Sequence, residues 1–443
     1  MARATAKARK RNVPKSGKPR SPAVPPSKPG LLSVLGPGLI TGASDDDPSG
    51  IATYSQGGAQ FGFAITWTLL FTYPLMAVIQ EISARIGRTT GKGIAANIRE
   101  HYPNWILQSV VVLLLAANII NIGADLGAMA DAVTLLVGGP KILYVVFFGG
   151  FCALLEVFMT YTRHASVLKW LTLALLAYFG TVLVVKVPWA EAARGFFIPT
   201  FASTAAFWAT VVAILGTTIS PYLFFWQASQ EVEDLDEAPE QEALVDAPGQ
   251  GKDANARIGI DTYVGMAFSN LVALAIMVTT AATLHVSGHT DIQTSSQAAE
   301  ALKPVAGAFA FAIFALGIVG TGLLAVPVLA GSAAYALGES RKWPVGLARK
   351  PLKARAFYLT IVVATLAGVG ISFSPIDPIK ALFWSAVING VVAVPVMVMM
   401  MLITANTEIM GQFTVKGLRY IIGWIATAVM AAAAVGMVVT SLP

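Results

Sequence analysis

The chain has 443 residues, of which 56% are hydrophobic and only 12% are charged, and its mean hydropathy is +0.68. These values lie outside the range of ordinary soluble domains and indicate an integral membrane protein. The formal net charge of +6 comes largely from the amino-terminal tail and short loops, so it does not indicate a nucleic-acid partner.

Residues 1–30 differ in composition from the rest of the chain. They contain nine Lys or Arg, six Pro and no acidic residue. They lack the apolar core that defines a signal peptide. We therefore expect a disordered, basic cytoplasmic tail at 1–30, followed by a membrane domain at 31–443.

Eleven later segments are long enough to cross a hydrocarbon core, which needs roughly 20 apolar residues. With the amino terminus in the cytoplasm, 25 of the 30 Lys and Arg residues fall on the cytoplasmic side. This bias predicts a multi-pass protein of the cell (inner) membrane whose carboxyl terminus lies outside. The segments run near 31–62, 64–85, 104–137, 141–161, 166–187, 203–230, 262–285, 304–337, 355–373, 379–403 and 417–441.

The first segment contains the stretch GASDDDPSGIATYS, which places Asp45, Asp46 and Asp47 where a membrane helix should run. Pro48 predicts a break there, because proline removes a backbone donor and disfavours helix at the preceding residue. A carboxylate at this depth costs several kcal/mol unless it faces water, a partner or a cation. No Lys or Arg lies in the segment, so a divalent cation is the favoured counter-ion, with one Asp as direct ligand and the others facing a water-filled vestibule. A proton relay and an ammonium site remain alternatives.

The sixth segment is interrupted in the same way, at Ile219-Ser220-Pro221-Tyr222. Corresponding breaks at the starts of two five-helix halves are the signature of inverted repeats with a central site between discontinuous helices. The pattern predicts repeats at about 31–187 and 203–403, with an additional helix at about 417–441.

Several of these motifs resemble one known family. GPGLITGASDDDPSGIATYSQGGAQFGF looks like the first helix of NRAMP-type divalent metal transporters, with its central Asp-Pro-Gly-Asn, and ILGTTISPYLFFWQASQ resembles their sixth-helix motif. GADLGAMADA and EIMGQFTVKGLRYIIGW extend the resemblance over about residues 31–440. The resemblance implies an all-α membrane protein with the leucine-transporter-type fold, namely 11 transmembrane helices, an inverted 5+5 repeat, and breaks in helices 1 and 6.

The departures from the family pattern concern the metal site. Asp47 is retained, whereas Gly50 stands where the family has a metal-binding Asn. Ser220 replaces the metal-binding Met and Tyr222 replaces a His, while Thr217 falls at the position whose carbonyl reaches the ion. The resemblance thus implies a metal site formed by Asp47, Gly50, Thr217 and Ser220, with Tyr222, Asp45 and Asp46 near it.

Ligand chemistry predicts what these replacements do. A thioether favours transition metals, whereas carboxylate, hydroxyl, carbonyl and water suit Mg²⁺, which sheds its waters reluctantly. The pattern is similar to that of the NRAMP-related magnesium transporters of prokaryotes. We expect an importer of Mg²⁺, and also Mn²⁺, that works by alternating access. The alternatives are a proton-coupled Mn²⁺ or Fe²⁺ importer and, less favoured, an amino-acid or amine transporter on the same fold.

Two further polar residues lie in apolar segments. Asp125 matches an Asp that serves proton transfer in the family, but Ala128 replaces its acidic neighbour. Asn389 could support a hydrated cation near the site, although a structural role is favoured. Gln227 replaces a second family histidine, so we expect transport without proton coupling.

Residues 231–257 carry nine carboxylates. We expect them to form a solvated acidic loop with a helical stretch between Leu235 and Val245. No Walker-type loop, nucleophile elbow or zinc-protease helix is present, so we expect no enzyme activity and no cofactor. The partners expected are the metal substrate and the lipid membrane, with no nucleic acid and no obligatory protein.

Overall fold

The computed structural model describes residues 41–42, 44–158, 175–238 and 240–441. Within these ranges the chain is helical and contains no strand. The predicted tail, most of the first half of the first segment and the start of the fifth segment lie outside them. The helices are α3 (Pro48–Phe61), α4 (Trp67–Thr90), α5 (Ile94–His101), α6 (Asn104–Val137), α7 (Lys141–Phe158), α9 (Leu176–Val184), α10 (Trp189–Phe197), α11 (Ala205–Thr218), α12 (Pro221–Glu237), α13 (Gly251–Thr280), α14 (Ser295–Glu300), α15 (Lys303–Ala306), α16 (Ala310–Ser340), α17 (Arg355–Ile371), α18 (Pro378–Ala405), α19 (Thr407–Met410) and α20 (Leu418–Ser441).

Short turns connect some of these helices. A 3-10 turn, η1 (Gly62–Ile65), joins α3 to α4, and a π-helical turn, η4 (Ala281–His285), ends α13. Further 3-10 turns are η3 (Pro248–Gln250), η5 (Gly307–Phe309), η6 (Pro351–Lys353) and η7 (Gly411–Phe413).

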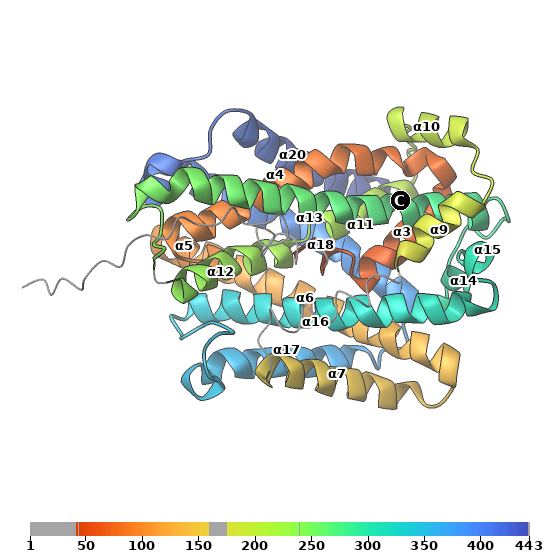
Figure 1. Cartoon of the computed structure of the whole chain (residues 1–443), viewed down its shortest axis with the longest axis horizontal. Coiled ribbons are helices and arrows are strands. Elements are labelled where there is room, and N and C mark those ends of the chain that lie inside the picture. Colours follow the sequence, from red (N-terminus) through yellow and green to blue (C-terminus); the bar gives the residue numbers. More distant parts are fainter. Residues whose placement is uncertain (1–40, 43, 159–174, 239, 442–443) are drawn as a thin grey trace, which may run out of the picture. The chain divides into compact units, whose positions relative to one another are not determined.

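The long helices lie side by side (Figure 1). In the described part of the chain, seven helical stretches are long and apolar enough to cross a membrane, and an eighth arises if α3 and α4, bent by 110°, count as one. α17 is a shorter apolar helix. The prediction of many apolar spans is confirmed, whereas the count of eleven stays a prediction.

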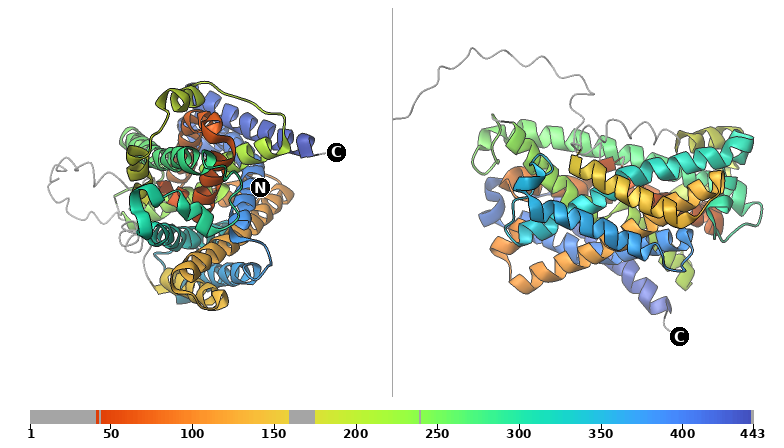
Figure 2. Two further views of the ribbon diagram at one scale, coloured as in Figure 1. Left: turned by 90° about the vertical axis from the view of Figure 1, so that its right-hand side faces the viewer. Right: turned by 90° about the horizontal axis from the view of Figure 1, so that it is seen from below.

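Both predicted breaks are present. α11 ends at Thr218 and α12 begins at Pro221, with Ser220 in an extended conformation between them. Thr41, Gly42, Ser44 and Asp45 are helical, the helix is interrupted at Asp46 and Asp47, and α3 begins at Pro48. Viewed along the long helices (Figure 2, left), the red segment that holds α3 lies among them, and its residues from Pro48 to Ser55 are buried.

The two halves of the sixth segment pack against different neighbours. α11 packs mainly against α18 and α20, whereas α12 packs mainly against α4 and α16. A Cβ at Gly216 of α11 would lie 2.0 Å from the carbonyl oxygen of Ala386 on α18, so only glycine permits this approach.

The prediction for the acidic stretch 231–257 is wrong in two respects. Helix α12 ends at Glu237, and the chain then turns, so no helix runs from Leu235 to Val245. Glu231 is buried and paired with Arg257 rather than solvated. The turn is held to the end of α4 by the amide of Leu244, which donates to the Arg88 carbonyl at 3.3 Å. Tertiary contacts, which charge patterning cannot reveal, fix this segment.

Candidate metal-binding site

Asp47 is the residue that begins α3. Its backbone is extended (φ −68°, ψ 170°), and its Oδ1 accepts hydrogen bonds from the Gly50 amide at 2.7 Å and the Ser49 hydroxyl at 2.6 Å. Aspartate is a favoured capping residue, and proline fits the first helical position, so the sequence Asp-Pro-Ser-Gly starts a helix at this point. The cap fixes one carboxylate oxygen of Asp47.

The second oxygen of Asp47 faces two other helices. Oδ2 accepts from Asn121 Nδ2 of α6 at 3.2 Å and lies 3.4 Å from the Tyr222 hydroxyl of α12. Asn121 is in turn held by the Ser385 hydroxyl of α18, which donates to Asn121 Oδ1 at 2.7 Å. The sequence interpretation missed Asn121, whose signal was a polar side chain in an apolar helix, one turn before Asp125.

Each proline leaves one carbonyl without its helical partner, because the residue four positions earlier would normally accept the missing N–H. These carbonyls belong to Ser44 and Thr217. The Tyr222 hydroxyl donates to the Ser44 carbonyl at 3.1 Å, and the Ser220 hydroxyl donates to the Thr217 carbonyl at 2.9 Å. The carbonyls of Ser44 and Thr217 therefore hold equivalent positions at the two breaks, and each accepts a hydrogen bond from a hydroxyl of the sixth segment.

Gly50 brings the two breaks into contact. A Cβ at this position would lie 3.0 Å from Thr217 Oγ1 and 3.3 Å from the Tyr54 ring. A larger side chain would require the Thr217 and Tyr54 side chains to shift by a few tenths of an ångström. The structure thus brings Asp47, Gly50, Thr217 and Ser220 to one region of buried oxygen atoms.

Asp45 and Asp46 take a different direction from Asp47. Both contact the hydroxyl of Ser269 on α13, at 2.6 Å and 3.2 Å. They are 0% and 2% exposed and are therefore buried in this conformation, so the expectation that they face a water-filled vestibule stays a prediction. Among the described residues, no three His, Cys, Asp or Glu side chains converge as a metal site. A cation at the breaks would therefore rely on Asp47 and on neutral oxygens.

Asp125 and Asn389 extend this polar region. Asp125 follows Asn121 by one turn of α6, and Asn389 follows Ser385 by one turn of α18. Both are fully buried, and within the described ranges neither carboxylate oxygen of Asp125 nor either amide atom of Asn389 has a hydrogen-bond partner. Buried polar groups normally have partners, so these four atoms are suited to contact water or a hydrated cation.

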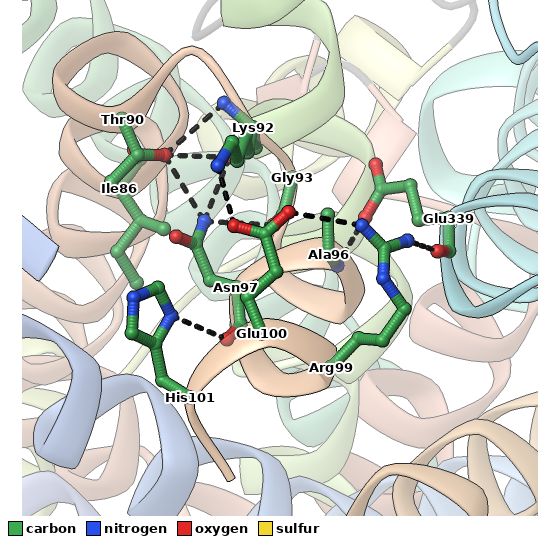
Figure 3. Close-up of polar contacts among 10 residues, drawn as sticks. All are labelled: Ile86, Thr90, Lys92, Gly93, Ala96, Asn97, Arg99, Glu100, His101 and Glu339. Carbon is green, nitrogen blue, oxygen red and sulfur yellow. Dashed lines mark hydrogen bonds and ion pairs between the residues drawn. The ribbon is translucent and has the colours of Figure 1, made fainter. Parts of the chain in front are cut away.

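A second polar cluster lies around α5 (Figure 3), and Ser229 of α12 joins it through Glu339. Glu339 of α16 accepts from the Ala96 amide of α5 at 3.1 Å and from the Ser229 hydroxyl of α12 at 3.2 Å. Arg99 also donates to the Glu339 carbonyl (Figure 3). A Cβ at Gly93 would lie only 1.9 Å from Glu339 Oε1. We call these contacts the α5 junction.

The two helix breaks and the buried carboxylate at the first of them define a membrane transporter with the leucine-transporter-type fold. The family described as "Natural resistance-associated macrophage protein-like" (Nramp) matches residues 38–440. The chain belongs to this family.

Individual relatives agree with that assignment. The chain is 26% identical over 422 residues to the divalent metal cation transporter MntH of Klebsiella pneumoniae (strain 342), covering 93% of this chain and 95% of the relative. It is 28% identical over 408 residues to MntH of Yersinia enterocolitica, covering 88% and 91%.

Solved structures share the fold at low sequence identity. A mutant form of the Eremococcus coleocola manganese transporter gives a TM-score of 0.73 at 17% identity, covering 94% of this chain and 88% of that one. Mhp1, a nucleobase-cation-symport-1 family transporter, gives 0.56 at 14% identity, covering 92% and 93%. The expected fold is confirmed.

Proposed function

We propose that this protein imports divalent metal cations by alternating access, with Mg²⁺ as its main substrate and Mn²⁺ as a second one. The observation that carries the proposal is the oxygen chemistry at the two breaks. Asp47 supplies a carboxylate, Ser44 and Thr217 supply backbone carbonyls at the two breaks, and Ser220 supplies a hydroxyl. The relatives named as divalent metal cation transporters support the substrate class.

The preference for Mg²⁺ rests on what is missing from this set. No described residue that hydrogen-bonds to Asp47 carries sulfur. Oxygen ligands and water suit Mg²⁺ and distinguish it only weakly from Mn²⁺, whereas a thioether would favour softer ions. The unpartnered groups of Asp125 and Asn389 support retention of part of the ion's water shell.

We further propose that transport is not coupled to protons. Tyr222 is held between Asp47 and the Ser44 carbonyl, and a phenol keeps its proton near neutral pH. Gln227 donates to Thr262 at 3.0 Å and accepts from Gln80 at 2.6 Å, so this network consists of amides and a hydroxyl. A proton-coupled Mn²⁺ or Fe²⁺ importer is the alternative.

The proposed location is the cell (inner) membrane, with the amino terminus in the cytoplasm and the carboxyl terminus outside. The distribution of Lys and Arg supports this orientation. It places α5 and the α5 junction at the cytoplasmic end of the helices.

The site assignment is tested by Mg²⁺ flux into proteoliposomes that contain the full chain. Asp47→Asn keeps the shape of the side chain but removes its charge, and we expect it to abolish flux. Asp131→Asn is the control. Asp131 lies farther along α6, its Oδ1 is 3.8 Å from Lys141 Nζ, and within the described ranges it makes no hydrogen bond or ion pair with the breaks, so flux should be unchanged. Full flux in Asp47→Asn would refute the assignment.

Ion selectivity and coupling need two more measurements on the same proteoliposomes. Mn²⁺ should compete with Mg²⁺ and Cd²⁺ should compete poorly; a strong preference for Cd²⁺ would refute the magnesium assignment. A pH dye inside the liposomes should report no acidification during Mg²⁺ uptake. Metal-dependent acidification would favour the proton-coupled alternative.

A further inference from the structure

A cavity lies away from the ion site, lined by residues of α4, α11 and α20. It has a volume of about 480 Å³. Its walls are almost entirely apolar, and the residues that define its length include Trp67, Phe71, Leu75, Trp208, Leu215 and Val429. We call this cavity the α4–α20 groove.

The groove is nearly as long as the hydrocarbon part of one leaflet of a bilayer. Its wall on α4 runs from Trp67 to Leu75, which is about 12 Å at the rise of an α-helix. Half of a hydrocarbon core is roughly 15 Å. The hydroxyls of Thr68 and Thr72 along this wall already donate to backbone carbonyls of the same chain, at 2.7 Å and 2.5 Å. They therefore leave the wall apolar.

The groove is continuous with the lipid-facing surface. Phe71, Ile425 and Val429 line it, and each is also about half exposed on the outside of the bundle. In a membrane, the molecules that meet this surface are lipid chains. A groove that opens toward the bilayer along its length is accessible to a chain from the surrounding lipid.

One end of the groove carries a free hydrogen-bond donor. The indole nitrogen of Trp67 is buried and, within the described ranges, has no partner. The Trp67 ring contacts Phe71 and Phe201, with ring centroids 6.0 Å and 5.1 Å away. Tryptophan is enriched at the membrane–water interface, where its ring is in hydrocarbon and its N–H meets polar headgroups. A phospholipid whose acyl chain lies in the groove would bring an ester carbonyl, an acceptor for this N–H, to the same end.

We propose that the α4–α20 groove is a phospholipid-binding site, which takes one acyl chain along its length and presents Trp67 Nε1 to the ester carbonyl of that chain. Leu215, which lines the groove, lies two residues before Thr217 of the ion site. The lipid thus contacts the half-helix that carries one of the proposed ligands. The proposal does not depend on which ion is transported.

The first test compares two alanines of α20 in the full-length protein. Ala432 lines the groove and is exposed, whereas Ala428 is also exposed but is not among the residues that line the groove. Native mass spectrometry after a matched detergent wash should show at least one palmitoyl-oleoyl phosphatidylglycerol fewer on Ala432→Trp than on wild type. Ala428→Trp should match wild type. Equal lipid retention in all three proteins would refute the proposed site. So would a wild-type spectrum that shows bound detergent and no retained phosphatidylglycerol.

The second test addresses the donor. Ether-linked phosphatidylglycerol lacks the ester carbonyl, so wild type should retain it several-fold less well than the ester-linked lipid. Trp67→Phe keeps an aromatic ring but removes the N–H, so it should retain both lipids equally. An ester preference that persists in Trp67→Phe would refute the role of Trp67. Added ester-linked lipid should raise the melting temperature of wild type more than that of Ala432→Trp, since a ligand stabilises the state it binds.

Discussion

The side-chain amide of Asn121 on α6 donates to Asp47 Oδ2 at 3.2 Å, while Oδ1 of the same carboxylate caps α3. Asn121 is oriented by Ser385, so the carboxylate is held from α6 and, through α6, from α18. Outer contacts of this kind orient metal ligands, and their loss typically lowers metal affinity 10- to 100-fold.

Asn121→Ala should therefore lower the apparent Mg²⁺ affinity by about tenfold while the protein still folds. The measurement is the concentration dependence of flux in proteoliposomes. Asn118→Ala is a matched control three residues earlier, because Asn118 binds Leu329 and Ser332 of α16 instead. It should lower thermal stability and leave the apparent affinity unchanged. The same loss of affinity in both variants would contradict a positioning role for Asn121.

Gly50→Ala tests the contact between the breaks. The added methyl group would lie 3.0 Å from Thr217 Oγ1, so the Thr217 side chain at the second break must shift by a few tenths of an ångström. Because Mg²⁺ keeps more of its waters than softer ions do, we expect a several-fold larger loss of flux for Mg²⁺ than for Mn²⁺. Gly57→Ala of the same helix, where the nearest atom is 3.5 Å away, should change neither. An equal loss of Mg²⁺ and Mn²⁺ flux in Gly50→Ala would show that Gly50 does not determine the selectivity between these ions.

Gly93→Ala tests the α5 junction. The methyl group would overlap Glu339 Oε1, so the carboxylate must leave the Ala96 amide or the Ser229 hydroxyl. We expect a loss of about 1–3 kcal/mol in stability, measured as a lower melting temperature. Gly150→Ala has no atom within 4 Å of its new methyl group and should melt like wild type. Ser229→Ala should add little to Gly93→Ala, because both act on the same carboxylate; full additivity would argue against one shared junction.

The α5 region also predicts a pH dependence. Partial burial raises the pKa of Glu100, but Lys92 at 2.5 Å and Arg99 at 3.1 Å outweigh it and hold the pKa below its ordinary value. A lowered pKa in the folded state gives stability that is present above the unfolded pKa of about 4.3 and is lost as the pH falls through the folded value. These groups are partly exposed, so solvent screening limits the effect to less than about 1 kcal/mol.

Glu100→Gln should therefore melt slightly below wild type at neutral pH, and the difference should vanish in acid. Melting curves across the acid range measure it. Glu408→Gln, an exposed glutamate for which the described structure gives no ion pair, should match wild type at each pH. A difference between Glu100→Gln and wild type that grows in acid would reverse the predicted sign.

The sequence predicted the breaks and the fold but only part of the site. Proline acts on its own backbone, so Pro48 and Pro221 could be placed from sequence alone, and so could the carbonyl of Thr217 through the family resemblance. Asn121 and Ser269 could not, because which face of α6 or α13 meets Asp47 or Asp45 depends on how whole helices pack. The prediction of a solvated loop at 231–257 was wrong for the same reason: Glu231 is buried and paired with Arg257, a contact that depends on how the helices pack.

The glycine contact between Gly216 and Ala386 fastens α11 to α18 backbone against backbone, whereas α12 is held to α4 and α16. The two halves of the sixth segment thus belong to two different groups of packed helices: α11 with α18 and α20, and α12 with α4 and α16. The extended residue Ser220 connects the two groups and can act as a hinge. The Thr217 carbonyl lies in the α11 group, and Tyr222, which contacts Asp47, lies in the α12 group. A rotation about Ser220 would move the Thr217 carbonyl away from Tyr222 and Asp47. Because the ion would contact both the Thr217 carbonyl and Asp47, we expect the ion to be released in the same step in which the helices move.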